Sequence, residues 1–230
     1  MNKAEQGAEG VVLAYATPIS CKVIAEAAAV NARLREIILE RMEREGGIQK
    51  SNVNGWHSLE DLFQWPNPEI QQLLGWVGQA VKAMTMFTTG ADQVSGEIDA
   101  WGWANVSWKG SYNKPHIHPD AMWSGVYYVD AGSSPEGQPD SGILEFLDPR
   151  SGIDVLKVPG MPYSGNFRVK PESGMIVLFP GWLYHFVNPY QGDDLRISIA
   201  FNVRVLDTDL PSSLFGGAVG YSPGPRWRRR

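Results

Sequence analysis

The spacing of apolar residues changes character about ninety residues into the chain. In the first part, apolar residues recur every three to four positions, from Ile19 to about Arg44 and again from Pro68 to about Phe87. This spacing places them on one face of a helix, so we predict two long helices there. Between them lies a turn-rich connector, and Ser58 in it has the spacing of a capping box, which predicts a third, short helix.

After residue 95, the apolar residues fall in short segments separated by glycine and proline. Such segments are typical of β-strands. Short strands with long irregular links favour a jelly roll over an alternating β-α-β sheet. We therefore predict a mainly β (α+β) fold, a double-stranded β-helix (jelly roll) with the N-terminal helices packed on one face. The predicted strands are residues 97–109, 114–118, 123–130, 143–147, 165–170, 175–180, 183–188 and 195–206.

The length of 230 residues suits a single domain with one sizeable core. Within it, we expect residues 1–94 to form a helical N-terminal buttress, residues 95–206 the jelly-roll core and residues 207–230 a C-terminal tail. The tail ends in the basic run PRWRRR, which is typical of a solvated chain end. A homodimer is common for proteins of this size, but the sequence does not determine the oligomeric state.

Composition narrows the class of protein. The chain is 43% hydrophobic and 20% charged, as in folded globular proteins. Its net charge of −5 argues against a general nucleic-acid binder. No stretch approaches the roughly 18 consecutive apolar residues of a membrane span, so we expect no membrane partner. The single cysteine, Cys21, excludes an intramolecular disulfide and fits a reducing compartment, so we expect a cytoplasmic protein with Cys21 buried.

Three of the four histidines have the spacing of a metal site. His116 and His118 form an H-x-H pair, and two residues apart on a strand they point to the same side. His185, in FPGWLYHFVNP, would approach from another strand of the same roll. Imidazole nitrogen suits Fe, Zn, Cu and Ni. The fourth histidine, His57, precedes the roll, and we interpret it as a capping or connector residue.

Two segments resemble the iron(II)- and 2-oxoglutarate-dependent oxygenases. The first, WANVSWKGSYNKPHIH, is similar to their first metal strand, because Gly110 lies six residues before His116. The second, PGWLYHFVNPYQGDDLRISIAFNV, is similar to their distal histidine followed by an R-x-S motif. The chain more narrowly resembles a bacterial and phage family of such oxygenases, through SNVNGWHS, NVSWKGSYNKPHIHP, SGVYYV and RISIAFNV.

The resemblance implies a site and a reaction. Fe(II) would be bound by three histidines, and 2-oxoglutarate would be bound by an arginine and a serine that grip its far carboxylate and by an asparagine. Dioxygen would be consumed, and a small-molecule or peptide substrate would be hydroxylated with release of succinate and CO₂. By spacing alone, the arginine could equally pair with a neighbouring aspartate, Asp193 or Asp194. The implied residues are His116, His118 and His185 for the metal and Arg196, Ser198 and Asn105 for the cosubstrate.

One position departs from the family pattern. His118 stands where these oxygenases usually have a carboxylate, which would make a site of three histidines. An alternative frame takes His118-Pro119-Asp120 as the usual H-x-D motif and makes Asp120 the ligand. That frame changes the spacing to Gly110 and puts a proline in the ligand strand, where a backbone donor is lost. We prefer the frame with His118.

Two other functions fit parts of the pattern. A cupin-type metalloenzyme that does not use 2-oxoglutarate would share the jelly roll and the H-x-H pair, with Glu145 as the candidate for its glutamate ligand. A non-enzymatic jelly-roll binding protein would use the histidines structurally. Tyr127 and Tyr128 alternate faces, and one of them is expected to line the substrate pocket. The segments Gly132–Gly142 and Pro159–Gly165 are expected to shape that pocket, because such loops usually carry specificity.

Overall fold

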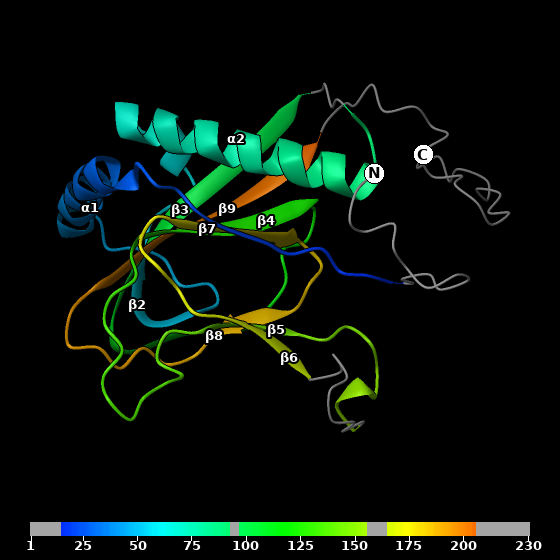
Figure 1. The fold of residues 1–230 in the computed structure, drawn as a ribbon. Helices are drawn as coiled ribbons and strands as arrows, with labels where there is room; N and C mark the ends of the chain where they lie inside the picture. The colour runs from blue at the N-terminus through cyan, green and yellow to red at the C-terminus, as the bar shows by residue number, and fades with distance from the viewer. Residues whose placement is uncertain (1–14, 93–96, 156–164, 206–230) are drawn as a thin grey trace, which may run out of the picture.

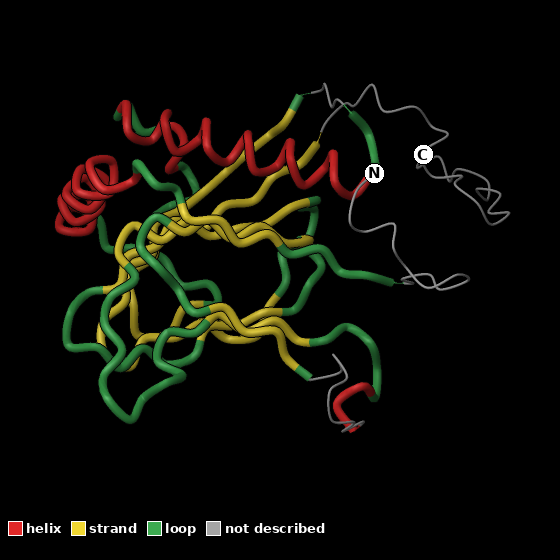
Figure 2. Tube along the Cα trace, viewed as in Figure 1, coloured by secondary structure: helices red, strands yellow, loops and turns green. Residues whose placement is uncertain are grey.

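A computed structural model describes residues 15–92, 97–155 and 165–205 of the chain. In these residues, two layers of antiparallel strands face each other, and two helices cover the outer side of one layer (Figures 1 and 2). The predicted jelly roll with helices on one face is confirmed. The elements in chain order are β1 (Ser20–Val23), α1 (Ala27–Arg44), β2 (Asn52–His57), the 3-10 turn η2 (Leu62–Gln64), α2 (Pro68–Thr89), β3 (Ile98–His116), β4 (Trp123–Asp130), β5 (Leu144–Leu147), the 3-10 turn η3 (Ile153–Val155), β6 (Asn166–Val169), β7 (Met175–Pro180), β8 (His185–Val187) and β9 (Arg196–Val205).

The strands form one hydrogen-bonded sheet that turns back on itself. Its order is β1-β7-β4-β9-β3-β8-β5-β6, and β2 pairs with β3 outside this path. The long strand β3 belongs to both layers, because residues 98–107 pair with β9 whereas Asn113 and His116 pair with β8. Gly110 lies between these two stretches with φ +86°, a left-handed conformation that glycine adopts without strain. Its N–H donates to the carbonyl of Tyr190 at 2.7 Å, which fixes the bend.

The layer that contains β9 is buried on both faces. One face packs against the helices, and the other faces the space between the two layers. Alternate residues of a strand point to opposite sides, and those of β9 separate cleanly into apolar and polar sets. The apolar set packs under α1 and α2, with Leu34, Ile38 and Leu73 among the helix residues in the same cluster. The polar set faces the space between the two layers. The apolar residues of β9 are Ile197, Ile199, Phe201 and Val203, and its inward-facing polar residues include Arg196, Ser198 and Asn202.

A second core fills part of the space between the layers. It consists of buried side chains from β4, β5, β6 and β7 together with Leu183. Both aromatic rings at its centre, Phe146 and Phe179, are almost completely buried, and their centroids lie 4.8 Å apart. The inward-facing polar residues of β9 therefore lie in a largely apolar, water-poor interior.

Several predicted elements differ from the observed ones at the N-terminal end. The first helix begins at Ala27 and not at Ile19, because residues 20–23 pair with β7 as the edge strand β1. Cys21 lies exposed on that strand, so the prediction of a buried cysteine is wrong. Ser58 does not cap a helix; its hydroxyl donates to the carbonyl of Leu59 at 2.7 Å, and only the 3-10 turn η2 follows.

The polar connector before Ser58 contains a strand. Residues 52–57 form β2, which pairs with β3, and His57 is its last residue rather than a connector residue. The helix predicted from Pro68 is confirmed as α2, which ends at Gly90 in a left-handed conformation. The predicted strands 97–109 and 114–118 are a single strand, β3, because the bend at Gly110 keeps the chain extended on both sides.

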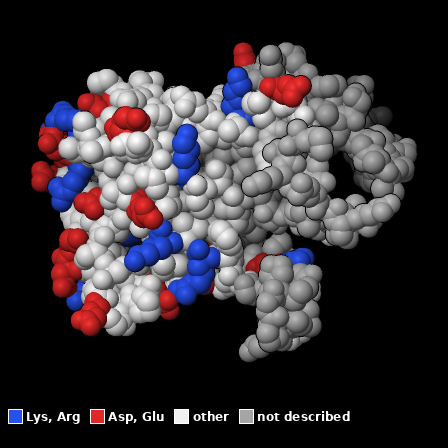
Figure 3. All heavy atoms as spheres, viewed as in Figure 1, with Lys and Arg blue, Asp and Glu red and all other residues white. Residues whose placement is uncertain are grey.

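Some predictions fall outside the described residues: the C-terminal tail at 207–230, the last residue of the strand predicted at 195–206, and nearly all of the loop predicted at 159–165. In the described part, none of the helices has the length and apolar character needed to cross a membrane. Figure 3 shows acidic and basic side chains mixed over the described part of the visible face.

Candidate metal centre

Three histidines converge where the two layers meet. His116 ends β3 and His185 begins β8, and the two are direct cross-strand partners. His118 follows two residues after β3, and its backbone N–H donates to the carbonyl of Gly181 at 2.8 Å. One ligand atom from each ring lies within 4.8 Å of the others, so a single metal ion could contact all three. Side chains from two strands and a loop thus build the cluster, although the strands are far apart in sequence.

Backbone carbonyls orient two of the rings. Nδ1 of His116 lies 2.7 Å from the carbonyl of Lys114, and Nδ1 of His185 lies 2.8 Å from the carbonyl of Leu183. A carbonyl only accepts, so each Nδ1 carries the proton and each Nε2 keeps its lone pair for a metal. Nε2 of His185 faces Nε2 of His118 at 3.3 Å. The hydroxyl of Ser51, which lies outside the cluster, is 3.3 Å from Nε2 of His116 and is within hydrogen-bonding distance of that ring.

The site keeps its histidines neutral. Burial, together with the nearby His116 and His118, lowers the pKa of His185 to about 3. Burial likewise lowers the pKa of His118 to about 4, with His116 contributing, and burial lowers the pKa of His116. A protonated imidazole cannot bind a metal, so these shifts hold the cluster in its metal-binding form at neutral pH.

Aromatic rings surround the cluster. Phe179 meets the His185 ring edge-on, with centroids 4.6 Å apart, and Trp103 lies 5.8 Å from the ring of His118. His57 also stacks on Trp103, with centroids 5.4 Å apart and an interplanar angle of 10°. His57 is therefore a buried strand residue that supports Trp103, and it lies outside the three-histidine cluster.

The residues predicted to bind a cosubstrate lie on the same inner face of the roll. Ser198 on β9 is the direct partner of Asn105 on β3 and of Tyr128 on β4, so all three point into the roll. Arg196 lies two residues before Ser198 on the same face and is 3% exposed. Its guanidinium carbon lies 5.1 Å from the centre of the Tyr128 ring. The structure therefore brings Asn105, Arg196 and Ser198 together and adds Tyr128.

Three buried polar atoms in this pocket have no hydrogen-bond partner among the described residues. They are Nε of Arg196, Oδ1 of Asn105 and the hydroxyl of Tyr128. A buried polar group without a partner costs free energy, so such groups cluster mainly where a ligand completes them. The expected competitors for Arg196 are engaged elsewhere: Asp193 pairs with Lys109 at 2.8 Å, and Asp194 accepts hydrogen bonds from Tyr190 and Ser133. The pocket therefore fits an anionic ligand.

Tyr128 is a pocket residue that the sequence alone does not distinguish from its neighbour Tyr127. Strand alternation separates the two neighbouring tyrosines of SGVYYV but does not say which one points inward. Tyr127 faces the helices, where its hydroxyl donates to Oδ1 of Asn31 at 2.5 Å. Tyr128 faces the roll, and burial raises its pKa while Arg196 acts in the opposite direction. Its hydroxyl thus stays protonated and can donate to a bound anion.

The alternative ligands lie away from the cluster. Asp120 is exposed, has a φ of +67°, and its backbone carbonyl accepts from Nε of Arg204 at 3.4 Å. On β5, Phe146 pairs with His185, and the preceding residue, Glu145, pairs with Phe186. Neighbouring residues of a strand point to opposite faces, so the Glu145 side chain points away from the face that carries His185. There it contacts Nε of Arg168 at 3.0 Å. The geometry thus favours His118 over Asp120 and gives no cupin-like glutamate ligand.

Solved structures of two prolyl hydroxylases and of a protein with 2-oxoglutarate bound share this fold. A prolyl-4-hydroxylase from Pseudomonas putida has a TM-score of 0.54 at 17% identity, covering 82% of this chain and 93% of that one. A prolyl hydroxylase from Trichoplax adhaerens, in complex with a hypoxia inducible factor peptide fragment, gives 0.57 at 14%, covering 81% and 83%. HygX from Streptomyces hygroscopicus, with nickel and 2-oxoglutarate bound, gives 0.52 at 14%, covering 83% and 84%. These similarities establish the fold.

A family model matches the part of the chain that contains the candidate site. No curated protein matches the chain. Residues 102–202 match the model of a family described as "Putative 2OG-Fe(II) oxygenase". This range contains the three-histidine cluster, Asn105, Tyr128, Arg196 and Ser198, so the match covers the whole candidate site. Both the fold and the site agree with the resemblance in the sequence, and the part of the chain that carries the site is similar to the 2OG-Fe(II) oxygenases.

Proposed function

We propose that the chain is a dioxygenase that hydroxylates an organic substrate, with Fe(II) bound by His116, His118 and His185 and with 2-oxoglutarate bound by Arg196, Ser198, Asn105 and Tyr128. The observation that carries this proposal is the buried, incompletely paired guanidinium on the same inner face as a cluster of neutral imidazoles. When bound, the iron supplies the oxidative chemistry, in which dioxygen and 2-oxoglutarate give succinate, CO₂ and a hydroxylated substrate.

The arrangement of the two parts of the site supports this cosubstrate. The His118 ring lies against Trp103, whose partner on β9 is Ala200, and Arg196 lies four residues from Ala200 on the same face of β9. A dicarboxylate can therefore contact the metal with one end and the guanidinium with the other. A planar guanidinium can hold a carboxylate with two parallel hydrogen bonds, which a lysine cannot do.

Charge balance favours a dianionic cosubstrate. Three neutral imidazoles leave the two positive charges of Fe(II) uncompensated, whereas a site with a carboxylate ligand carries one positive charge less. Arg196 adds another positive charge in a water-poor interior, where an unpaired charge is costly. The two carboxylates of 2-oxoglutarate offset this charge, one at the metal and one at the guanidinium.

The substrate is proposed only by class, as a small molecule or a peptide. Similar folds include a prolyl hydroxylase in complex with a peptide fragment and HygX with hygromycin B bound. Mixed surface charge and a net charge of −5 disfavour a nucleic-acid substrate. As part of the proposal, we place the enzyme in the cytoplasm, since its single cysteine fits a reducing compartment, and treat it as one domain. A homodimer stays a prediction, which light scattering would check.

Succinate formation tests the proposed function. The iron-loaded protein should convert 2-oxoglutarate to succinate only with dioxygen present, and Arg196→Ala should raise the KM for 2-oxoglutarate strongly. Arg204→Ala is the matched control, because Arg204 lies on the same strand with a largely exposed side chain. If metal-loaded protein binds no 2-oxoglutarate in an anaerobic titration, the proposal is wrong. A cupin-type enzyme would instead keep its activity in Arg196→Ala.

A further inference from the structure

One buried tyrosine next to the carboxylate pocket contacts three glycines. Tyr190 is 1% exposed and lies in the segment between β8 and β9. A Cβ added at Gly132 or at Gly192 would overlap its phenol oxygen, and one added at Gly142 would lie 3.3 Å from its ring. The three glycines therefore leave room for this ring, and no larger residue fits at Gly132 or Gly192 without moving it.

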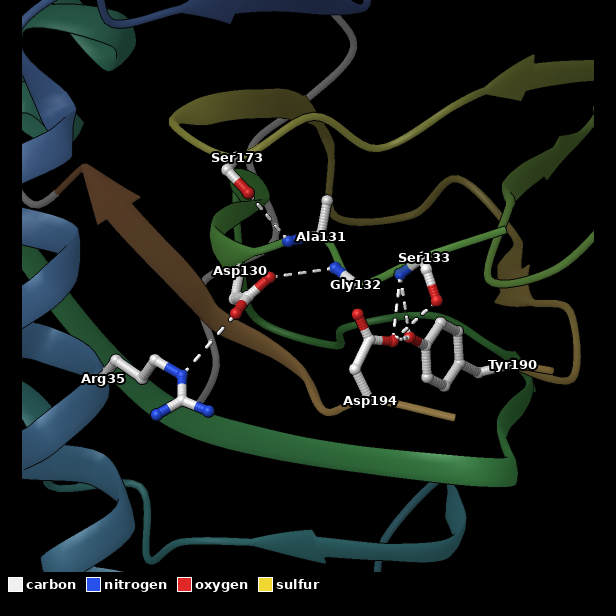
Figure 4. Close-up of polar contacts among 8 residues, drawn as sticks. All are labelled: Arg35, Asp130, Ala131, Gly132, Ser133, Ser173, Tyr190 and Asp194. Carbon is white, nitrogen blue, oxygen red and sulfur yellow. Dashed lines mark hydrogen bonds and ion pairs between the residues drawn. The ribbon is translucent and has the colours of Figure 1, made fainter. Parts of the chain in front are cut away.

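Hydrogen bonds fix the phenol in this position. The Tyr190 hydroxyl donates to Oδ1 of Asp194. The backbone N–H of Ser133 donates to the Tyr190 oxygen at 2.9 Å and to Oδ1 of Asp194 at 3.1 Å, and the Ser133 hydroxyl donates to the same carboxylate oxygen at 2.8 Å (Figure 4). These three residues connect the start of the loop between β4 and β5 to the segment that leads into β9.

The same loop is held at both of its ends. At its start, the N–H of Ala131 donates to the Ser173 hydroxyl at 3.0 Å, and the N–H of Gly132 donates to the carboxylate of Asp130 at 3.1 Å (Figure 4). At its end, the N–H of Gln191 donates to the Ser141 hydroxyl at 2.8 Å. Residues 131–142 therefore form a closed strap whose middle part, residues 134–140, is mostly exposed.

This strap ends against the side chain of Arg196. A Cβ added at Gly142 would lie 3.4 Å from both Cδ and Nε of Arg196. The Tyr190 ring lies beside the same glycine, so Gly142 has Tyr190 and Arg196 as neighbours. On its other side, the guanidinium faces the Tyr128 ring at 5.1 Å. The arginine is thus enclosed between a fixed aromatic ring and a backbone wall that Tyr190 supports.

We propose that Tyr190 is a positioning residue for the cosubstrate. Held by Asp194 and Ser133, it keeps the strap closed against Arg196, and the closed strap sets both the affinity for 2-oxoglutarate and the length of 2-oxo acid that the pocket accepts. This inference rests on the proposed function. An arginine that is ordered before binding loses less conformational freedom when it binds a carboxylate, so a wall that holds it in place increases affinity.

The test compares two conservative substitutions of buried tyrosines. Tyr190→Phe removes the hydroxyl that joins Ser133 and Asp194. Tyr127→Phe is the matched control, because it removes a buried hydroxyl that hydrogen-bonds Asn31 on the helix side of the sheet. Two measurements are made: the Kd of anaerobic iron-loaded protein for 2-oxoglutarate and for 2-oxoadipate, which is one methylene longer, and amide hydrogen exchange over residues 131–142 of metal-free protein.

Tyr190→Phe should raise the Kd for 2-oxoglutarate about tenfold or more, the expected cost of hydrogen bonds to a charged group. It should also reduce the ratio of the Kd for 2-oxoadipate to the Kd for 2-oxoglutarate. Amide hydrogen exchange over residues 131–142 should become faster. In turnover, KM for 2-oxoglutarate should rise while kcat changes little. Tyr127→Phe should leave all five quantities near their wild-type values.

Three results would overturn the inference. The first is a wild-type Kd in Tyr190→Phe, and the second is unchanged exchange over residues 131–142. The third is an equal loss of affinity in Tyr127→Phe, which would indicate a general structural effect. Failure of the proposed function looks different, because the wild-type protein itself would then bind no 2-oxoglutarate, and the inference would fall with it.

Discussion

His116 and His185 are direct cross-strand partners, one at the end of β3 and the other at the start of β8, with ring centroids 4.3 Å apart. Because β3 turns at Gly110 from one layer into the other, the strand that carries His116 also carries Asn105, which faces Ser198 in the first layer. A single strand therefore connects the candidate metal centre to the candidate carboxylate pocket.

The choice between His118 and Asp120 can be tested by metal content. His118→Ala should lower the bound iron per chain well below one, because it removes one of three converging ligands. His118→Asp should keep iron and 2-oxoglutarate turnover, since it provides the carboxylate that the family usually has at this position. Asp120→Ala is the control and should leave iron binding unchanged, because Asp120 is exposed outside the cluster. Loss of iron in Asp120→Ala alone would show that the ligand frame is wrong.

The bend in β3 should depend on Gly110. Its φ of +86° is unfavourable for any residue with a Cβ, so we expect Gly110→Ala to lower the free energy of unfolding by about 1–2 kcal/mol. Gly78 offers a matched control inside α2, with nothing within 4 Å of an added Cβ. There the same change should raise stability by up to about 1 kcal/mol, through helix propensity. Urea denaturation measures both, and equal effects of the two substitutions would contradict the role of the bend.

Acid should destabilise the metal-free protein through its buried histidines. The folded pKa values of about 4 for His118 and about 3 for His185 lie below the ordinary 6.5. The unfolded chain therefore binds protons near pH 6.5, while the folded chain does not until the pH reaches 3–4. The stability conferred by the neutral imidazoles is thus complete above pH 6.5 and is lost as the pH falls from there toward 3–4.

Each histidine contributes up to about 1.4 kcal/mol of this loss per pH unit. Urea denaturation at pH 7.5 and at pH 5, with a chelator present, measures the effect. His118→Gln removes one titrating group, so its stability should depend less steeply on pH. An identical pH dependence in wild type and His118→Gln would show that the imidazole of His118 is not shielded from water.

Tyr128→Phe should separate stability from cosubstrate binding. The Tyr128 hydroxyl is buried without a partner among the described residues, so its removal should leave the free energy of unfolding unchanged or slightly higher. The affinity for 2-oxoglutarate should fall severalfold, because the pocket loses a donor beside Arg196. Calorimetry of the metal-loaded protein measures the affinity. If the variant binds 2-oxoglutarate as tightly as wild type, the hydroxyl does not contact the ligand.

The sequence predicts most strands of the roll because their residues alternate or form short apolar runs, as in Met175–Pro180. It does not reveal β1 and β2, because four residues of SCKV and the polar segment NVNGWH carry too little hydrophobic pattern. These segments become strands only because β7 and β3 provide backbone hydrogen-bond partners. The local sequence of each segment does not predict this pairing. The helix predicted from Ile19 therefore begins eight residues later, at Ala27.

The sequence by itself determined the fold class and pointed to the residues of the candidate site, because motif spacing such as Gly110 to His116 and Arg196 to Ser198 is local information. Only the tertiary structure decided which tyrosine of SGVYYV faces the roll, that Asp120 and Glu145 lie away from the histidines, and that Tyr190 and Arg196 both lie beside Gly142. Each of these depends on strand register and on contacts between distant segments. Such relations arise from packing of the whole chain, and spacing along the sequence does not contain them.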